Sequence, residues 1–204
     1  MPYIKEAVVE TAEEIENVIK YNPQRIELCS RLDIGGLTPT WELTNFCLTK
    51  GVETVIMMRN RPDFYTTWLS TCKLIRTIKK FNRTNVKGYV MGIITIDNTV
   101  DLKAMKKLMK AAQGKDVIFH MAFDQIKNQK KAIDQLVSLG VKRVLTKGGS
   151  DKAVNNIEQL KKLKEQADGR IEIIVGGGVN DDNWTMIAQA TGLEQFHGRK
   201  LACK

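Results

Sequence analysis

Two short apolar segments of this sequence end in histidine. His120 follows Val-Ile-Phe and His197 follows Glu-Gln-Phe, and the chain has only these two histidines. Histidine gains and loses its proton near neutral pH, so both are candidates for proton transfer. Asp124 lies four residues after His120, and Glu27 lies in another apolar segment. We therefore predict His120, Asp124 and Glu27 as catalytic groups; the alternative is that the histidines are hydrogen-bonded structural residues.

Two features of the sequence are suited to an anion. Arg59 ends the segment Val-Ile-Met-Met-Arg, where a buried cation needs either an anionic ligand or a structural ion pair with Glu27 or Glu6. Gly176-Gly-Gly178 precedes a helix predicted to begin near Asp181, and the first N–H groups of a helix attract phosphate or carboxylate. The predicted anion-binding residues are Arg59, Gly176, Gly177 and Gly178.

One cysteine occupies a position where it could bind a metal ion. Cys29 alternates with Glu27 in a predicted strand, so both side chains point to the same face. Cu(I) takes two or more sulfur or imidazole donors, which Met57, Met58 or Met91 could complete as thioethers. The other cysteines, Cys47, Cys72 and Cys203, lack metal-site spacing, and we expect them to be free thiols.

The elements that must position these residues alternate along the whole chain. Apolar and β-branched segments predict strands over residues 4–9, 24–29, 53–58, 86–94, 116–119, 141–145, 170–175 and 193–196. Helical periodicity and capping residues predict helices over 12–21, 41–50, 65–82, 101–112, 127–139, 150–166 and 181–190. Strands alternating with helices in this number predict an α/β fold, a single (β/α)8 TIM-type barrel. An open doubly wound sheet is the alternative, but its GxGxxG motif after the first strand is absent.

A barrel would bring the carboxyl ends of its strands together at one face. The further pocket residues predicted at these ends are Glu6, Ser30, Thr146 and His197. Residues 1–204 contain no linker and are expected to form one domain. The last predicted strand leaves no room for a complete eighth helix, so we expect a barrel open on that side unless a partner covers it. This predicts a homo-oligomer, most simply a dimer.

Composition restricts the partners and the location. The chain has a formal net charge of +9, but its lysines lie along the predicted helices, as on a solvated outer surface. No nucleic-acid motif accompanies them, so small anionic ligands are the expected partners and nucleic acid is not. No segment approaches the roughly 18 apolar residues of a membrane span, and no signal peptide precedes the first strand. A cytoplasmic protein without membrane contact is expected.

Several motifs occur together in an order that resembles the CutC family, known as copper-homeostasis proteins with a TIM-barrel fold. The motifs are Arg25-Ile-Glu-Leu-Cys-Ser30, Gly35-Gly36 with Thr38-Pro39, Met58-Arg59 with Asp63-Phe64, Phe119-His-Met-Ala-Phe-Asp124, Arg143-Val-Leu-Thr146 with Gly148, Gly176-Gly-Gly178 and Phe196-His197. The resemblance covers essentially the whole chain. It implies Cu(I) binding through Cys29, although the first-strand cysteine typical of the family is Val8 here.

Two hypotheses about function follow. In the first, the protein is a copper-homeostasis protein that binds Cu(I) through Cys29, as the resemblance implies. In the second, it is a barrel enzyme acting on a small anionic or phosphorylated metabolite. Its pocket would contain Glu27, Arg59, His120, Asp124 and His197.

Overall fold

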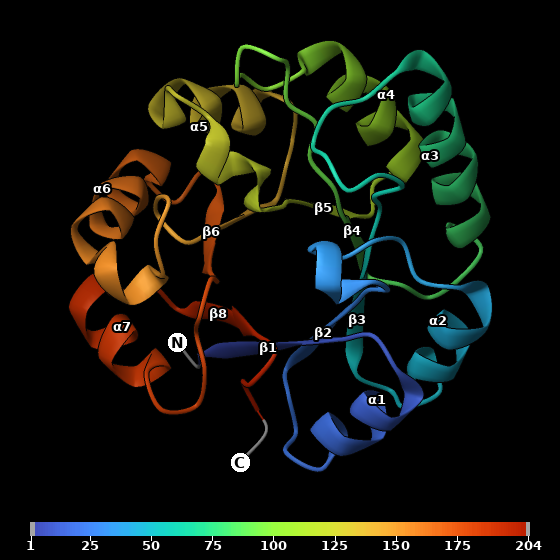
Figure 1. The fold of residues 1–204 in the computed structure, drawn as a ribbon, viewed down its shortest axis with the longest axis horizontal. Helices are drawn as coiled ribbons and strands as arrows, with labels where there is room; N and C mark the ends of the chain where they lie inside the picture. Colours follow the sequence, from blue (N-terminus) through green and yellow to red (C-terminus); the bar gives the residue numbers. More distant parts are fainter. Residues whose placement is uncertain (1–2, 203–204) are drawn as a thin grey trace.

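The strands form one closed parallel barrel in a computed structural model that describes residues 3–202 (Figure 1). The strands are β1 (Ile4–Val9), β2 (Arg25–Leu28), β3 (Glu53–Met57), β4 (Gly88–Val90), β5 (Asp116–Phe119), β6 (Arg143–Thr146), β7 (Glu172–Val175) and β8 (Gln195–Gly198). Each strand pairs in parallel with the next, and β8 pairs with β1, placing Glu6 beside His197. The predicted barrel is confirmed.

Seven α-helices surround the barrel, and three short 3-10 helices lie in its loops. The α-helices are α1 (Ala12–Ile19), α2 (Trp41–Leu48), α3 (Trp68–Phe81), α4 (Leu102–Ala112), α5 (Gln129–Ser138), α6 (Ile157–Ala167) and α7 (Trp184–Thr191); the 3-10 helices are η1 (Leu32–Ile34), η2 (Met121–Gln125) and η3 (Ala153–Asn155). Within residues 3–202 no eighth helix follows β8, as predicted. The strands nevertheless pair into a complete ring, so the missing helix leaves the barrel closed and only its outer side without that helix. The dimer stays a prediction.

Some helices begin later than the sequence pattern predicts, because polar loops occupy their expected first turns. The side chain of Asn156 donates hydrogen bonds to the carbonyl oxygens of Lys147 and Asp151, which holds residues 147–156 as a loop with η3 and delays α6. The Asn183 side chain similarly accepts a hydrogen bond from Asn180 N–H and donates to Gly178 O, so α7 begins at Trp184. These loops belong to the end of the barrel that carries the polar pocket.

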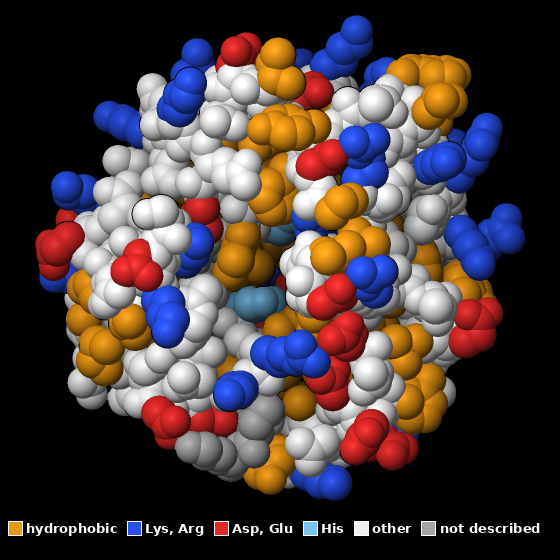
Figure 2. Space-filling view, in the orientation of Figure 1, with side chains coloured by type: hydrophobic (Ala, Val, Ile, Leu, Met, Phe, Trp, Pro, Cys, Tyr) orange, Lys and Arg blue, Asp and Glu red, His pale blue; other side chains and the backbone are white. Residues whose placement is uncertain are grey.

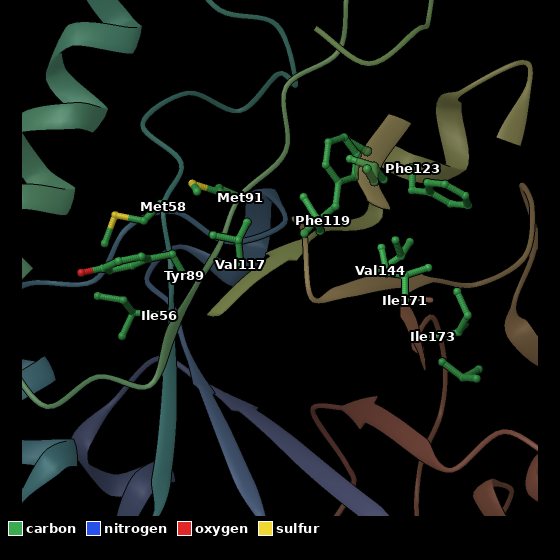
Figure 3. Close-up of a cluster of buried hydrophobic side chains, with 14 of the residues drawn as sticks. Ile56, Met58, Tyr89, Met91, Val117, Phe119, Phe123, Val144, Ile171 and Ile173 are labelled. Carbon is green, nitrogen blue, oxygen red and sulfur yellow. The ribbon is translucent and has the colours of Figure 1, made fainter. Parts of the chain in front are cut away.

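Side chains alternate between two apolar regions. The outward-facing residues of the strands pack against the helices, as Figure 3 shows for Ile56, Met58, Tyr89 and Met91. Each fully buried large apolar side chain stabilises the fold by roughly 1.5–3 kcal/mol. The smaller inner cluster fills the barrel, with Val8, Cys29, Val55, Met57, Val90, Ile118, Leu145 and Ile174. The period of two along each strand therefore decides which residues reach the barrel interior.

A charged network fills the interior toward the amino-terminal ends of the strands. The buried Arg25 guanidinium donates to the Glu6 carboxylate and to the amide oxygen of Gln195 at 2.9 Å. Arg143 pairs with Asp116 and Glu172, both at 2.9 Å. Because each buried charge has an opposite charge or a hydrogen-bond partner, the network avoids the cost of isolated buried ions.

The structure also shows the state of three cysteines and the lengths of the helices. Cys29, Cys47 and Cys72 are free thiols, and Cys203 lies outside the described residues. Over residues 3–202, no helix combines the length and apolar character needed to cross a membrane. The cytoplasmic location stays a prediction.

Candidate functional site

A cavity of about 260 Å³ opens at the carboxyl ends of the strands. Its lining residues are Val8, Glu27, Cys29, Leu32, Gly35, Met57, Phe64, His120, Met121, Leu145 and His197. We call it the mouth cavity. Histidine side chains lie in the central hollow of the molecular surface in Figure 2, bordered by apolar side chains. The η1 segment supplies Leu32 and covers part of the opening.

Glu27 brings a carboxyl group with an unused oxygen into this cavity. Its Oε1 accepts a hydrogen bond from the Cys29 thiol at 3.3 Å, whereas its buried Oε2 has no hydrogen-bond partner. Burial raises the pKa of Glu27 to about 7, the nearby Glu6 carboxylate also raises it, and His197 counteracts both. A carboxyl group with this pKa gains and loses a proton at neutral pH, as a general base must.

His197 is positioned by two carboxyl groups. Its Nδ1 lies 2.8 Å from Glu6 Oε1 and 3.4 Å from Glu27 Oε2. Burial opposes the imidazolium ion, but the charges of Glu27 and Glu6 outweigh it and raise the pKa of His197. Burial likewise opposes ionised Glu6, but Arg25 and His197 lower its pKa to about 2. Glu6 is therefore a fixed anion that orients His197 and leaves the ring Nε2 for the cavity.

His120 is held in the opposite protonation state. Its Nδ1 accepts a hydrogen bond from Ala122 N–H at 3.2 Å, so the proton of the neutral ring resides on Nε2. Burial and the charge of Arg59 lower the pKa of His120 to about 3. Gly92 makes room for the ring, because a Cβ there would lie 2.9 Å from His120 Nδ1. His120 is thus a neutral donor through Nε2, with no acceptor for this N–H among the described side chains.

Within the described part of the chain, Asp124 makes no hydrogen bond to His120, and its predicted part in proton transfer stays a prediction. Its Oδ1 accepts a hydrogen bond from Thr146 Oγ1 at 2.5 Å, and its carboxylate accepts from Lys147 N–H. Burial raises the pKa of Asp124 to about 6, against these hydrogen bonds. Thr146 also accepts from Gly148 N–H at 2.9 Å. Asp124 and Thr146 therefore fasten η2 to the end of β6, outside the mouth cavity lining.

Arg59 pairs with neither Glu27 nor Glu6. Its guanidinium group donates to the carbonyl oxygens of Ile34, Gly35, Gly36, Pro62 and Asp63. Arg59 thus joins the loop after β2 to the loop after β3, which keeps Gly35 at the cavity edge. Its predicted role as an anion clamp has little geometric support, because carbonyl oxygens already occupy the N–H groups that would hold the anion.

Ser30 is likewise a loop residue. Its hydroxyl donates to the carbonyl oxygen of Thr38 at 2.9 Å, and its backbone pairs with Leu37. This pairing closes the base of the segment that carries η1 over the barrel. Ser30 therefore shapes the mouth cavity without lining it.

Cys29 lies in the cavity with one of the three methionines considered as thioether donors. Met57 lines the cavity beside Cys29, whereas Met58 and Met91 point outward into the core of Figure 3. Burial raises the pKa of the Cys29 thiol well above its usual range, and the Glu27 carboxyl raises it further. The thiol is therefore held protonated, which is the unsuitable state for a metal ligand.

A second cavity of about 310 Å³ adjoins the first, and we call it the glycine cavity. It is lined by Met121, Gly177, Gly178, Val179, Asn180, His197, Gly198, Arg199 and Lys200. Met121 and His197 line both cavities. Sequence reasoning identified the glycines, but it missed Met121, Leu32, Phe64 and Leu145 in the lining, and Arg199 and Lys200 beside the glycines. A basic pair directly after the last strand was the available signal.

Glu6, Glu27 and His197 are also the group of potential metal ligands that the described residues bring together, with ligand atoms within 4.8 Å of one another. Glu6 is already bonded to Arg25 and His197. Glu27 Oε2 makes no hydrogen bond, but it lies 3.4 Å from His197 Nδ1. The contacts are those of a proton-sharing network more than of a metal centre.

Comparisons with known proteins agree with this architecture. A model of the CutC family matches residues 3–202. A CutC family protein of Vibrio cholerae is 35% identical over 201 residues, which cover 97% of this chain and 79% of that protein. A Streptococcus pyogenes relative is 37% identical over 186 residues, covering 87% of this chain and 89% of that protein.

Solved structures show the same relationship. A crystal structure from Streptococcus agalactiae, named as a copper homeostasis protein CutC, has a TM-score of 0.93 and 36% identity, covering 98% of this chain and 99% of that one. An aldolase, QR15, has a TM-score of 0.69 at 14% identity over 98% of this chain and 92% of its own, which shows a shared fold alone. This chain belongs to the CutC family.

Proposed function

We propose that the protein is a barrel enzyme that transfers a proton on a small anionic metabolite bound in the mouth cavity. The observation that carries the proposal is the buried Oε2 of Glu27, which makes no hydrogen bond and has only an ion-pair contact with His197 Nδ1 at 3.4 Å, in a residue that lines the cavity. A buried polar atom left without a partner costs free energy, which a structure retains when the atom has a task.

The three polar groups of the mouth cavity have complementary roles. Glu27 is the base that removes a proton from carbon, since its pKa of about 7 lets it accept the proton near neutral pH. His120 donates its Nε2–H to the oxygen of an adjacent carbonyl, where negative charge develops as the proton leaves. His197 presents Nε2 from the other side, in a position to protonate or to bind the same molecule. Proton abstraction next to a carbonyl group is the reaction class that suits this arrangement.

Proton exchange with solvent tests this proposal and does not require the product to be identified. A panel of small hydroxycarbonyl compounds and their phosphate esters, incubated with the protein in D2O, should contain members that lose a C–H signal by proton NMR. We expect Glu27→Gln to slow this exchange by about 100-fold or more, because general base catalysis typically contributes 10²–10⁴. His120→Gln should slow it less, since glutamine keeps a donor.

The control for this experiment is Glu165→Gln, an exposed glutamate of α6. It should exchange at the wild-type rate. Exchange that persists in Glu27→Gln at the wild-type rate would rule out Glu27 as the base. A panel without any exchanging compound, on a folded protein, would count against the reaction class.

Cu(I) binding through Cys29 is the second candidate function, following the copper-homeostasis name of the Streptococcus agalactiae relative. One observation favours it, because Cys29 and Met57 line the same cavity. The remaining donors do not fit. The Cys29 proton is held toward Glu27, His120 Nδ1 is bonded to Ala122 N–H, and His197 Nδ1 is bonded to Glu6. Cu(I) prefers thiolate and imidazole donors that are free to bind it.

A titration with Cu(I) against a competing chelator separates the two candidates. For the fully reduced protein we expect no more copper bound than for Cys29→Ser, and no one-to-one site. Cys72→Ser, which removes a thiol from α3 outside the cavity, controls for adventitious thiol binding. Tight binding that disappears in Cys29→Ser alone would establish the copper site and displace the enzyme proposal.

A further inference from the structure

The backbone of the glycine cavity presents unused hydrogen-bond donors. Gly177 and Gly178 have φ angles of +79° and +87°, a left-handed conformation that turns the chain outward between β7 and α7. Among residues 3–202, the N–H groups of Gly177 and Gly178 have no acceptor, whereas Gly176 N–H donates to Thr146 O at 2.9 Å. Successive free N–H groups at such a turn form a concave surface that favours an anion.

Basic side chains surround the same turn. The side chains of Lys147 and Lys152 pack against Gly177 and Gly178, and Arg199 and Lys200 line the cavity from the other side. Arg199 also pairs with Glu10 and Glu14. Figure 2 shows lysine and arginine side chains bordering the central hollow on its lower side.

The acidic residue Asp181, near this turn, is bound elsewhere in the fold. Its Oδ1 lies 3.4 Å from Lys5 Nζ and accepts a hydrogen bond from Ala202 N–H. Its negative charge is thus partly balanced by Lys5. Because Arg199 is paired with Glu10 and Glu14, the positive charge at the turn comes mainly from the lysines, and it favours a doubly charged anion over a neutral ligand.

His197 connects this surface to the mouth cavity. The residue is only 8% exposed, and its Nε2 has no hydrogen-bond partner among the described residues. The Cδ2 edge of its ring and the Met121 methyl group both lie against Gly176, since a Cβ at that glycine would lie 3.3 Å and 2.6 Å from them. A side chain at position 176 would therefore displace Met121 and His197, the two residues that line both cavities. An imidazole ring that is more than nine-tenths buried, with an Nε2 that makes no hydrogen bond to the described residues, thus lines both cavities.

We propose that the glycine cavity binds the phosphate group of a phosphate monoester whose carbonyl-bearing carbon chain lies in the mouth cavity. This inference rests on the proposed function and identifies its substrate class. The phosphate oxygens accept from Gly177 and Gly178 N–H and from His197 Nε2, with Lys200 and Lys152 supplying positive charge. The apolar lining of the mouth cavity, including Leu32, Met57 and Leu145, accommodates a short carbon chain.

Inorganic phosphate is the probe for this subsite. The two histidines give two sets of imidazole NMR signals, which His120→Gln assigns. We expect phosphate to shift the signals of His197 and leave those of His120 unchanged. The double variant Lys152→Gln/Lys200→Gln should bind phosphate at least tenfold more weakly. Both lysines are exposed, so their replacement leaves the fold intact.

Matched variants and probes separate the possible outcomes. Lys103→Gln/Lys106→Gln changes two exposed lysines of α4 and should bind phosphate as the wild type does. An equal loss in this control, an equal shift by acetate, or no shift of His197 would overturn the subsite. Glu27→Gln should still bind phosphate. Retained phosphate binding with no exchange activity would overturn only the proposed reaction, and exchange of unphosphorylated compounds alone would overturn only the subsite.

Discussion

Arg25→Met is expected to lower the free energy of unfolding by about 3–5 kcal/mol. The substitution leaves the carboxylate of Glu6 inside the barrel without the guanidinium that balances it, and breaking a buried ion pair from one side has this typical cost. It also removes the hydrogen bond to Gln195, which leaves that amide oxygen with fewer donors. Urea denaturation at neutral pH measures the loss.

Two further variants identify the cause. Glu6→Gln combined with Arg25→Met should recover part of the loss, because it removes the uncompensated charge. Arg170→Met breaks an exposed pair with Asp134 and should cost no more than about 1 kcal/mol. If Arg25→Met were as mild as Arg170→Met, the interior network would contribute little to stability.

Glu27→Gln is expected to raise the free energy of unfolding at pH 8 by about 2–3 kcal/mol. The Glu27 carboxyl has a pKa of about 7 in the folded protein and an ordinary value of 4.5. Above pH 7 it is ionised in both states, and the buried charge then lowers the free energy of unfolding. The folded protein holds the proton more tightly than the unfolded chain does. The contribution of Glu27 to the free energy of unfolding therefore falls as the pH rises from about 4.5 to about 7. Glu27→Gln should remove this pH-dependent loss.

His197 contributes to the same pH range with the same sign. Its pKa is raised in the folded protein, so its contribution to stability is complete below its ordinary value and is lost as the pH rises through the folded value. Glu6 acts in the opposite sense, because its pKa of about 2 makes its contribution complete above 4.5 and lost on acidification. We thus expect the wild-type protein to be most stable near pH 5.

Urea denaturation at pH 5 and pH 8 tests this prediction for wild type, Glu27→Gln and the exposed control Glu165→Gln. Glu27→Gln should raise the free energy of unfolding at pH 8 and raise it less at pH 5. Glu165→Gln should leave it unchanged at both pH values. A variant less stable than wild type at pH 8 would show that ionised Glu27 is well compensated. A residue that lowers stability while supplying a reactive group is a common compromise at functional sites.

Much of the fold follows from local patterns in the sequence. The sequence predicts that Glu27 and Cys29 share one face of their strand, and the structure places that face inside the barrel. Strand β5 begins and ends at its predicted residues. A period of two and a period of 3.6 are properties of short segments, so a single sequence reveals them. The closed barrel was predicted from the number of alternating strands and helices, whereas the register that pairs β1 with β8, strands at opposite ends of the chain, is visible only in the structure.

The residues of the candidate site were likewise predicted in part from the sequence and in part only from the structure. The sequence by itself determined that Glu27, Cys29, His120 and His197 would meet at one end of the barrel, since strand ends converge there in any such fold. Only the tertiary structure decided how each polar group is used. The Arg59 guanidinium donates to loop carbonyl oxygens, and Asp124 accepts a hydrogen bond from Thr146. Glu27 Oε2 has no hydrogen bond, only an ion-pair contact with His197. The physical reason is that the charge and pKa of each group depend on its burial and on its hydrogen-bonding and charged neighbours. These neighbours come from loops and strands that are distant in sequence, so a local sequence pattern does not predict them.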